Sequence, residues 1–563
     1  MRYIKEILQK NRIWVGIYIA IGIFSSFLTN YKAEFFQKVV DGLASRTATL
    51  TGILIYGGIL IAKYLIDYFD EYPAKKLEHG ICLDFKLLAL KKISRTDYLE
   101  YQKIGMGMIV QRIENGADAG RNVVFHFWFQ LVRQLIPTVL FSVYFIYKIN
   151  RKVTYILLVG YVVIFIVTNV LLKFLYEIKE RILDNEEKLN HYLIRGFMEM
   201  VIFRMERQFP NEIKKASSAK DKIVSAKVKM NMIHEAFFTI FALLVAILNV
   251  GILIFAWKTQ DISVGSVVAL LTLIENAYTP IAIFNVIYVQ YKLDWTAFER
   301  FEQLLLMKED SQLQEGKLVQ NVSGELSVQN LFFQYGDRAL LNNLSLSILK
   351  GEKIAFVGES GSGKSTLAKL LVGLLKYDKG HIYLEHEELS DICLDELYKK
   401  VTYLTQDAPV FDGTLRENLV FDKKVDDKEI LKVLEKVNLS QMVSQLENGL
   451  DTAIGERGTC LSGGEKQRLA IARIWFDNPE IVVLDEATSA MDALTEEAVM
   501  NNLMELLQGK TVIAITHRLN LIDAYDKIVV FNKGEVVGVG SYNELMDANP
   551  YFTQLYNGNF SRA

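Results

Sequence analysis

The 563-residue sequence predicts an all-α membrane domain of six transmembrane helices, followed by a cytoplasmic α/β domain. The long apolar runs all lie in the first half of the chain. After about Gly324, short β-rich runs alternate with helical ones, which is typical of a largely parallel sheet. A glycine-rich segment, Gly358–Ser365, separates an apolar strand from a helical run in this second half.

The composition combines membrane and globular character. Hydrophobic residues make up 51% of the chain and charged residues 23%, which favours two distinct regions. The net charge of -3 gives no bulk electrostatic reason to expect a nucleic-acid partner. Cys82, Cys393 and Cys460 are too scattered for a disulfide framework or a metal site.

The six apolar runs can each cross a hydrocarbon core of about 30 Å, which needs about 20 residues. They lie near residues 13–28, 51–69, 123–147, 153–176, 236–257 and 264–291. Buried helices of a large soluble protein are the alternative, but the number of runs and their aromatic ends disfavour it. We therefore divide the chain into a transmembrane domain (1–307), a linker (308–324) and a second domain (325–563).

The connections between the spans differ in length and charge. Residues 71–122 and 177–235 form long, helical-type segments rich in Lys and Arg. Because positive loops stay in the cytoplasm, we expect both segments, both termini and the second domain to be cytoplasmic, in a multi-pass protein of the cell membrane. Lys148, Arg151 and Lys152 contradict this topology, since it places them outside.

The segment Gly358-Glu-Ser-Gly-Ser-Gly-Lys-Ser365 fits the phosphate-binding pattern G-x-x-x-x-G-K-[ST]. Glycines let backbone N–H groups close around phosphate oxygens, and the start of the following helix adds positive potential. Lys364 is expected at the β- and γ-phosphates, and the Ser365 hydroxyl at Mg²⁺. The predicted nucleotide-binding residues here are Gly358, Ser360, Gly361, Ser362, Gly363, Lys364, Ser365 and Thr366.

A second motif is the apolar run Ile481–Leu484, which ends in Asp485 and Glu486. Ligands gather at the carboxyl ends of parallel strands, so Asp485 is placed to support Mg²⁺. Glu486 is then placed to polarise the water that attacks the γ-phosphate. Together the two motifs predict a P-loop NTPase that uses Mg²⁺.

Leu461-Ser-Gly-Gly-Glu-Lys-Gln467 precedes a helical run and offers a hydroxyl and free amides at a helix start. With the arginine that follows, it resembles the signature of the ATP-binding-cassette (ABC) family, with LSGGE in place of the commoner LSGGQ. The resemblance extends over essentially the whole chain, and it implies an exporter-type (type IV) half-transporter. It also implies that Ser462, Gly463, Gly464 and Glu465 bind nucleotide.

The same resemblance implies further roles. Tyr335 corresponds to the aromatic that stacks on adenine, and Asp492 to the aspartate at the dimer seam. Gln406 corresponds to the glutamine that contacts Mg²⁺, and His517 to the switch histidine at the γ-phosphate. The expected catalytic set is Lys364, Gln406, Glu486 and His517, and the expected metal set is Ser365, Gln406 and Asp485.

One chain cannot supply both the phosphate loop and the signature to the same nucleotide, so a dimer is expected. All motifs are intact, which favours a homodimer, with a heterodimer as the alternative. The segments Gly107–Glu114 and Glu199–Gln208 are hypothesised to couple the membrane domain to the nucleotide domains.

The predicted function is ATP-driven export of an amphipathic peptide, lipid or drug by alternating access. The alternatives are an importer of the siderophore type with the same fold, or a non-transporting cassette ATPase. Charged residues inside membrane spans are expensive and mark functional sites, so Glu275 is hypothesised to contact substrate. Lys63 and Arg133 are interpreted as residues that extend their charges to the interface.

Overall fold

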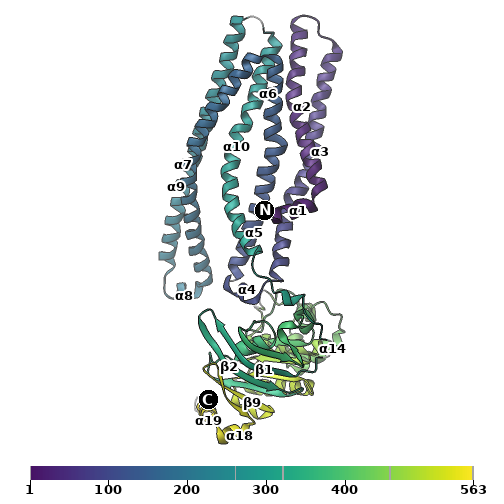
Figure 1. Cartoon of the computed structure of the whole chain (residues 1–563), viewed down its shortest axis with the longest axis vertical. Coiled ribbons are helices and arrows are strands. Elements are labelled where there is room, and N and C mark those ends of the chain that lie inside the picture. The colour runs from purple at the N-terminus through teal and green to yellow at the C-terminus, as the bar shows by residue number, and fades with distance from the viewer. Residues whose placement is uncertain are drawn as a thin grey trace. The chain divides into compact units, whose positions relative to one another are not determined.

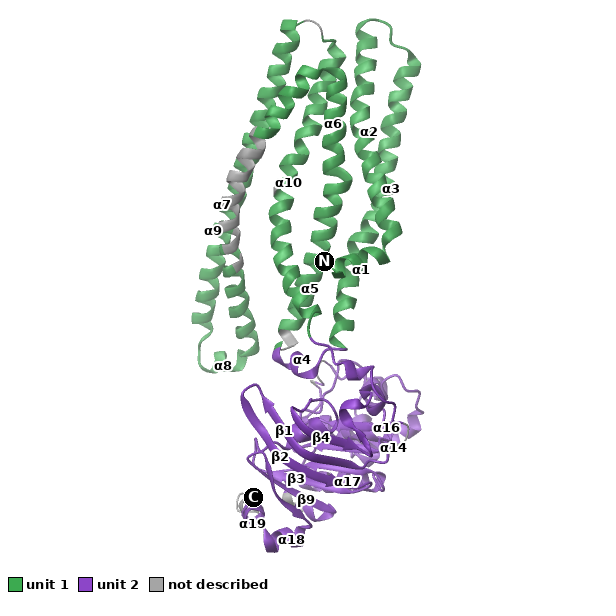
Figure 2. Ribbon diagram, viewed as in Figure 1, with its two compact units in different colours: residues 1–94, 104–307 green, residues 95–103, 308–563 purple. Residues whose placement is uncertain are grey.

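The computed structural model describes residues 2–104, 106–259, 262–319, 322–455, 458 and 460–560. Within these ranges, the side chains of 106–107, 163–177, 179–180, 183, 285, 519–521 and 558–560 are not described. The chain forms two compact units, coloured separately in Figure 2. The first comprises Met1–Ser94 and Ile104–Met307, and the second comprises Arg95–Lys103 and Lys308–Ala563.

The first unit is helical. Figure 1 shows its long helices, among which α7 and α9 run side by side. Its α-helices are α1 (Arg2–Lys10), α2 (Arg12–Ala44), α3 (Leu50–Ile93), α5 (Met106–Arg121), α6 (Ile136–Ile149), α7 (Arg151–Met198), α8 (Met200–Met205), α9 (Phe209–Thr259) and α10 (Val264–Leu305). Two π-helical stretches, η1 (Asn122–Phe129) and η2 (Leu131–Leu135), connect α5 to α6.

Among the described residues, five helical stretches are long and apolar enough to cross a membrane. They are Arg12–Ala44, Leu50–Ile93, Met108–Ile149, Phe209–Thr259 and Val264–Leu305. The remaining predicted span, 153–176, falls within α7, but the side chains of residues 163–176 are not described. The protein is therefore a multi-pass membrane protein.

The second unit contains two sheets. The antiparallel sheet has the order β2-β1-β4-β5, from β1 (Leu326–Tyr335), β2 (Arg338–Ile348), β4 (Lys379–Leu384) and β5 (Glu387–Glu388). The larger sheet has the order β10-β9-β3-β8-β7-β6 and is parallel except for β10. Its strands are β3 (Lys353–Gly358), β6 (Val401–Leu404), β7 (Ile481–Asp485), β8 (Thr511–Ile515), β9 (Lys527–Asn532) and β10 (Glu535–Gly540).

Helices complete the second unit. They are α4 (Tyr98–Ile104, whose last residue belongs to the first unit), α11 (Lys364–Leu371), α12 (Leu394–Leu397), α13 (Leu415–Val420), α14 (Asp427–Lys436), α15 (Ser440–Ser444), α16 (Gly463–Asp477), α17 (Ala493–Leu506), α18 (Tyr542–Ala548) and α19 (Pro550–Phe560). The separate antiparallel sheet was not anticipated by the sequence prediction of one largely parallel sheet.

The parallel strands are buried on both faces. Successive side chains of a strand point to opposite faces, so Val482 and Leu484 of β7 enter one core while Ile481 and Val483 enter the other. Parallel sheets covered on both faces are apolar throughout, which explains the uninterrupted run before Asp485. The carboxyl ends of β3 and β7 consequently meet at one edge of the sheet.

The first coupling hypothesis, Gly107–Glu114, stays a prediction. Residues 107–114 lie in α5 of the first unit, whereas Arg95–Lys103 belongs to the second. Tyr98 and Leu99 pack against the core cluster that contains Leu367 and Leu370 of α11. The Asp97 N–H donates to the Lys308 carbonyl, and Thr96 and Glu309 form an antiparallel bridge. A helix of seven residues is too short for periodicity to reveal such packing.

Candidate functional site

The loop Gly358–Gly363 connects the buried strand β3 to α11. Gly358 and Gly363 have φ values of +147° and +105°, a region that strongly favours glycine. A Cβ at Gly358 would also overlap the Phe531 carbonyl oxygen. Both the backbone conformation and the lack of space therefore exclude a side chain at this position. Ser360 and Gly361 are exposed in the loop, while Ser362 and Thr366 are buried.

Lys364 begins α11, and its ammonium turns back into this loop. Its Nζ donates to the carbonyl oxygens of Gly358 and Glu359, both at 2.8 Å. The side chain is only 4% exposed, and this burial lowers the pKa of the amine, although nearby Glu486 and Asp485 oppose the effect. The loop therefore concentrates a cation and backbone N–H groups, which is the arrangement that binds phosphate.

Asp485 ends β7 and has both carboxylate oxygens engaged. The Ser365 hydroxyl donates to Oδ1 at 2.9 Å, and the Tyr403 hydroxyl donates to Oδ2 at 2.8 Å. Burial raises the pKa of Tyr403 above its ordinary value, so the phenol stays protonated and can donate. Sequence reasoning missed Tyr403; the available signal was an aromatic residue three positions before Gln406.

Oxygen donors from Ser365 and Asp485 are the ligands that Mg²⁺ prefers. Among the described residues, no group of three or more His, Cys, Asp or Glu side chains could hold a metal by itself. A magnesium ion in nucleotide enzymes is held by one or two protein oxygens together with substrate phosphates, so this sparse set fits it.

Glu486 lies between two other predicted catalytic residues. The Gln406 amide donates from Nε2 to Glu486 Oε2 at 2.9 Å, and His517 Nε2 lies 3.1 Å from Oε1. Glu486 has a φ of +50°, an unusual value for a residue with a side chain, and such strain gathers at functional sites. Burial, together with the charge of Lys364, lowers the pKa of His517, so the imidazole is neutral near pH 7.

The signature residues begin α16 and form a capping box. The Ser462 hydroxyl and N–H both donate to the Glu465 carboxylate, at 2.7 Å each. Gly463 and Gly464 lie against Ala490, where a Cβ on Gly464 would come within 3.0 Å of the Ala490 carbonyl oxygen. Gln467 also holds this helix start against residues 489–490. Its Nε2 donates to Ser489 Oγ, and its Oε1 accepts from the Ala490 N–H.

Two further predicted residues occupy ends of secondary structure. The Asp492 carboxylate caps α17 by accepting from the Thr495 N–H at 3.0 Å, which holds its pKa below the usual range. Tyr335 is the last residue of β1; it is 38% exposed and its ring packs edge-on against Phe333. An exposed tyrosine ring at this position is available for stacking.

The structure thus brings together the phosphate loop, Ser365, Asp485, Glu486, Gln406 and His517. Within the described part of the chain, no hydrogen bond or ion pair joins the signature segment to the phosphate loop.

Family comparisons match both halves of the chain. The model of the ABC transporter transmembrane region matches residues 13–280, and the ABC transporter model matches residues 341–489. The chain belongs to the ABC transporter family. This membership confirms the resemblance drawn from the signature segment, and it identifies the second unit as the ATP-binding domain of an ABC transporter.

Individual relatives agree with this assignment. The uncharacterized ABC transporter ATP-binding protein YwjA of Bacillus subtilis is 36% identical over 305 residues, which cover 54% of this chain and 53% of the relative. The matched region thus spans about half of that relative's length. The ATP-dependent lipid A-core flippase of Alcanivorax borkumensis is 29% identical over 91% of this chain and 88% of its own.

A solved structure supports the fold along the whole chain. The bacterial Atm1-family ABC exporter with ATP bound superposes with a TM-score of 0.80, covering 98% of each chain at 21% identity. The predicted fold class, a helical membrane domain followed by an ABC-type α/β domain, is therefore confirmed.

The membrane half of this ABC transporter contains a largely buried ion pair that contradicts the interpretation of Arg133. The Arg133 guanidinium pairs with Asp70, lies over the Tyr18 ring at 3.7 Å, and is only 13% exposed. Lys63 pairs with Asp67. Arg133 therefore does not extend its charge to an interface. The carboxylate partner of Lys63 is one turn away on the same helix and 46% exposed, so the interpretation of Lys63 stays a prediction.

Glu275 differs from these pairs. Its side chain is exposed on α10, and its carboxylate has no hydrogen bond or ion pair in the described part of the chain. The neighbouring Asn276 makes a long, 3.5 Å bond to the buried Asn30.

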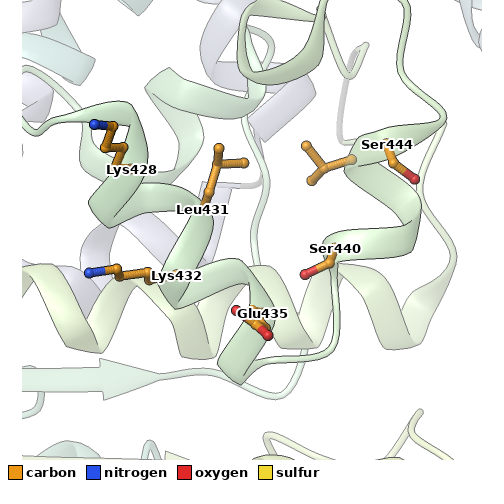
Figure 3. Close-up of a pocket in the computed structure, with 7 residues that line it drawn as sticks. Lys428, Leu431, Lys432, Glu435, Ser440 and Ser444 are labelled. Atoms are coloured by element: carbon orange, nitrogen blue, oxygen red, sulfur yellow. The ribbon is translucent and has the colours of Figure 1, made fainter.

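A surface pocket of about 510 Å³ lies between α14 and α15 of the ATP-binding domain. Figure 3 shows Leu431 directed toward α15, whereas Lys428 and Lys432 extend away from it. None of the predicted nucleotide-site residues lines this pocket.

Proposed function

We propose that this ABC transporter uses ATP binding and hydrolysis to export an amphipathic substrate across the cell membrane by alternating access. The observation that supports this most directly is the carboxylate of Glu486, held between Gln406 and His517 beside the phosphate loop. The same chain carries five described helices of membrane-spanning length and composition. The membrane-region match favours transport over a non-transporting cassette ATPase.

In this proposal, Lys364 and the loop amides bind the phosphates, and Tyr335 stacks on adenine. Ser365, Asp485 and Gln406 would hold Mg²⁺, which would supply positive charge to neutralise the phosphate oxygens. Glu486 orients and deprotonates the attacking water, because its carboxylate is the only one that contacts both Gln406 and His517 among the described residues. Neutral His517 donates from Nε2, the nitrogen that faces Glu486.

In this proposal, a second copy of the chain completes the nucleotide-binding site. The signature amides of Ser462, Gly463 and Gly464 and the carboxylate of Asp492 do not bond to the phosphate loop of their own chain, so the partner copy supplies them. We propose a homodimer because every motif is present in this chain, with a heterodimer as the alternative. ATP binding closes the two ATP-binding domains on each other, and hydrolysis releases them.

We place both termini and the ATP-binding domain in the cytoplasm. Lys148, Arg151 and Lys152 dissent from this topology, although the Lys148 Nζ lies 2.6 Å from the buried carboxylate of Glu34. The more numerous Lys and Arg residues of segments 71–122 and 177–235 favour the cytoplasmic placement, because positive residues set the orientation.

The substrate class rests on Glu275 and on the relatives. A flippase for lipid A-core among the relatives is consistent with an amphipathic substrate. An exposed, unpaired carboxylate inside a membrane span is expensive against lipid, so we propose that Glu275 faces the transport path and attracts positive charge.

The test is reconstitution of the purified protein in lipid, with ATPase activity measured across a panel of lipids, peptides and drugs. A transported substrate is expected to stimulate hydrolysis. Uptake of that substrate into inverted but not right-side-out vesicles supports export, and the reverse result supports the importer. Extraction by carbonate without detergent would overturn the membrane assignment.

Glu275→Gln tests the charge preference. For two amphiphiles of equal size, we expect the half-stimulating concentration of the cationic one to rise about tenfold, the equivalent of ~1.4 kcal/mol, relative to the neutral one. Glu187→Gln, which changes an exposed carboxylate on α7, is the matched control. An equal change in the half-stimulating concentration of both amphiphiles would show that Glu275 does not recognise the charge of the substrate.

A further inference from the structure

Tyr403 contacts the nucleotide site from a strand that carries none of the phosphate-binding residues. It lies in β6, which pairs in parallel with β7, and its Cα partner is Val483, two residues before Asp485. Its hydroxyl reaches past the strand end to donate to Asp485 Oδ2 at 2.8 Å. The ring packs against the core cluster that also contains Ile481 and Val483.

The two donors to Asp485 come from opposite directions. Ser365 belongs to the phosphate loop and its helix, and it occupies Oδ1 at 2.9 Å. Tyr403 occupies Oδ2 from the neighbouring strand. A carboxylate with one donor can rotate about its Cβ–Cγ bond, whereas a carboxylate with a donor on each oxygen is held in one orientation.

This orientation matters for the Ser365 hydroxyl. While its proton is donated to Asp485, the lone pairs of its oxygen are free for a cation. Without the Tyr403 hydroxyl, Asp485 Oδ2 has no hydrogen-bond donor, and the carboxylate can rotate. Rotation would weaken the hydrogen bond from the Ser365 hydroxyl to Asp485 Oδ1, which sets the direction of the Ser365 proton. The strand that carries Tyr403 also leads directly to Gln406, the other proposed oxygen ligand.

We propose that Tyr403 is a positioning residue that orients Asp485 and thereby strengthens retention of the divalent cation with ATP. This inference rests on the proposed ATP and Mg²⁺ site of Ser365, Asp485 and Gln406. It assigns Tyr403 no contact with the nucleotide or the reacting water. A structural role alone, holding β6 against β7, requires only the ring.

The test uses Tyr403→Phe, which retains the ring and removes the hydroxyl. The full-length protein, in lipid nanodiscs, carries Glu486→Gln to prevent turnover, and Mn²⁺ replaces Mg²⁺ as an ion with similar oxygen preference. Mn²⁺ affinity in the presence of ATP is measured by electron paramagnetic resonance. We expect the Mn²⁺ dissociation constant to rise about three- to tenfold, as for loss of one hydrogen bond.

Tyr377→Phe is the matched control, because it removes another tyrosine hydroxyl that donates to a carboxylate, Glu388, at 3.0 Å in the same unit. It is expected to leave Mn²⁺ affinity unchanged. ATP binding in excess chelator is expected to be the same for the parent and Tyr403→Phe. With turnover restored, the Mg²⁺ concentration for half-maximal ATPase activity is expected to rise by a similar factor.

Two results would overturn the proposal. One is a Mn²⁺ affinity of Tyr403→Phe within about twofold of the parent, which is less than the effect expected for the loss of one hydrogen bond. The other is loss of ATP binding in chelator as well, which would assign the hydroxyl to the fold of the site. Ser365→Ala separates this inference from the proposed function: if it leaves Mn²⁺ affinity unchanged, the proposed metal site itself is wrong.

Discussion

Glu486, the proposed general base, has a strained backbone conformation. Its backbone has a φ of +50°, immediately after the buried strand β7. The bend turns the side chain toward Gln406 and His517, which approach from two other segments of the same domain. Asp485, one residue earlier, is engaged by Ser365 and Tyr403 instead. Two adjacent carboxylates therefore have separate partners, as their separate proposed roles require.

Glu486→Gln is expected to bind ATP but to reduce hydrolysis at least about 100-fold, because an amide cannot accept the proton of the attacking water. ATPase activity in lipid and retention of nucleotide by the purified variant measure the two effects. Glu497→Gln makes the same change at an exposed position on α17 and should hydrolyse normally. Undiminished hydrolysis by Glu486→Gln would contradict the role assigned to this residue.

At the scale of elements, π-helical backbone and buried charge coincide in the membrane half. Arg133 lies in η2 and pairs with Asp70 of α3, while its guanidinium covers Tyr18 of α2. A Cβ at Gly22 would overlap the Arg133 side chain, so α2 is shaped to admit it. The ion pair thus fastens three helical elements to one another at a place where the regular helix is interrupted.

Asp70→Asn is expected to destabilise the membrane domain by about 3 kcal/mol or more, because it leaves the Arg133 charge buried without a partner. Thermal unfolding in detergent measures the loss. The double variant Asp70→Asn with Arg133→Gln should recover part of it, since the orphaned charge is then removed. Single variants that add up to the effect of the double variant would mean that the two residues do not interact.

At the scale of the whole molecule, the separation of the signature from the phosphate loop supports the proposed dimer. The signature forms its own capping box and packs on Ala490, while Lys364 and Asp485 lie at the edge of the parallel sheet. In the proposed function, a complete ATP site therefore needs two chains.

Protein held as a strict monomer in small nanodiscs is expected to hydrolyse ATP at least about 100-fold more slowly than the dimer, because it lacks the second set of donors around the phosphates. Activity is compared after separation of particles that contain one or two chains. Equal rates per chain would contradict a shared site.

The sequence by itself determined the membrane helices, the parallel sheet's buried strands and the family. It did so because apolar runs and the motifs around Lys364 and Asp485 are local in the chain, and their physical meaning follows from composition and spacing. The family came from the resemblance of the segment around Ser462 to the ABC signature. Only the tertiary structure decided that Arg133 is paired, that Tyr98 packs with the ATP-binding domain, and that Tyr403 reaches Asp485. These contacts join segments far apart in the chain, and each depends on the direction of a side chain that no local pattern encodes.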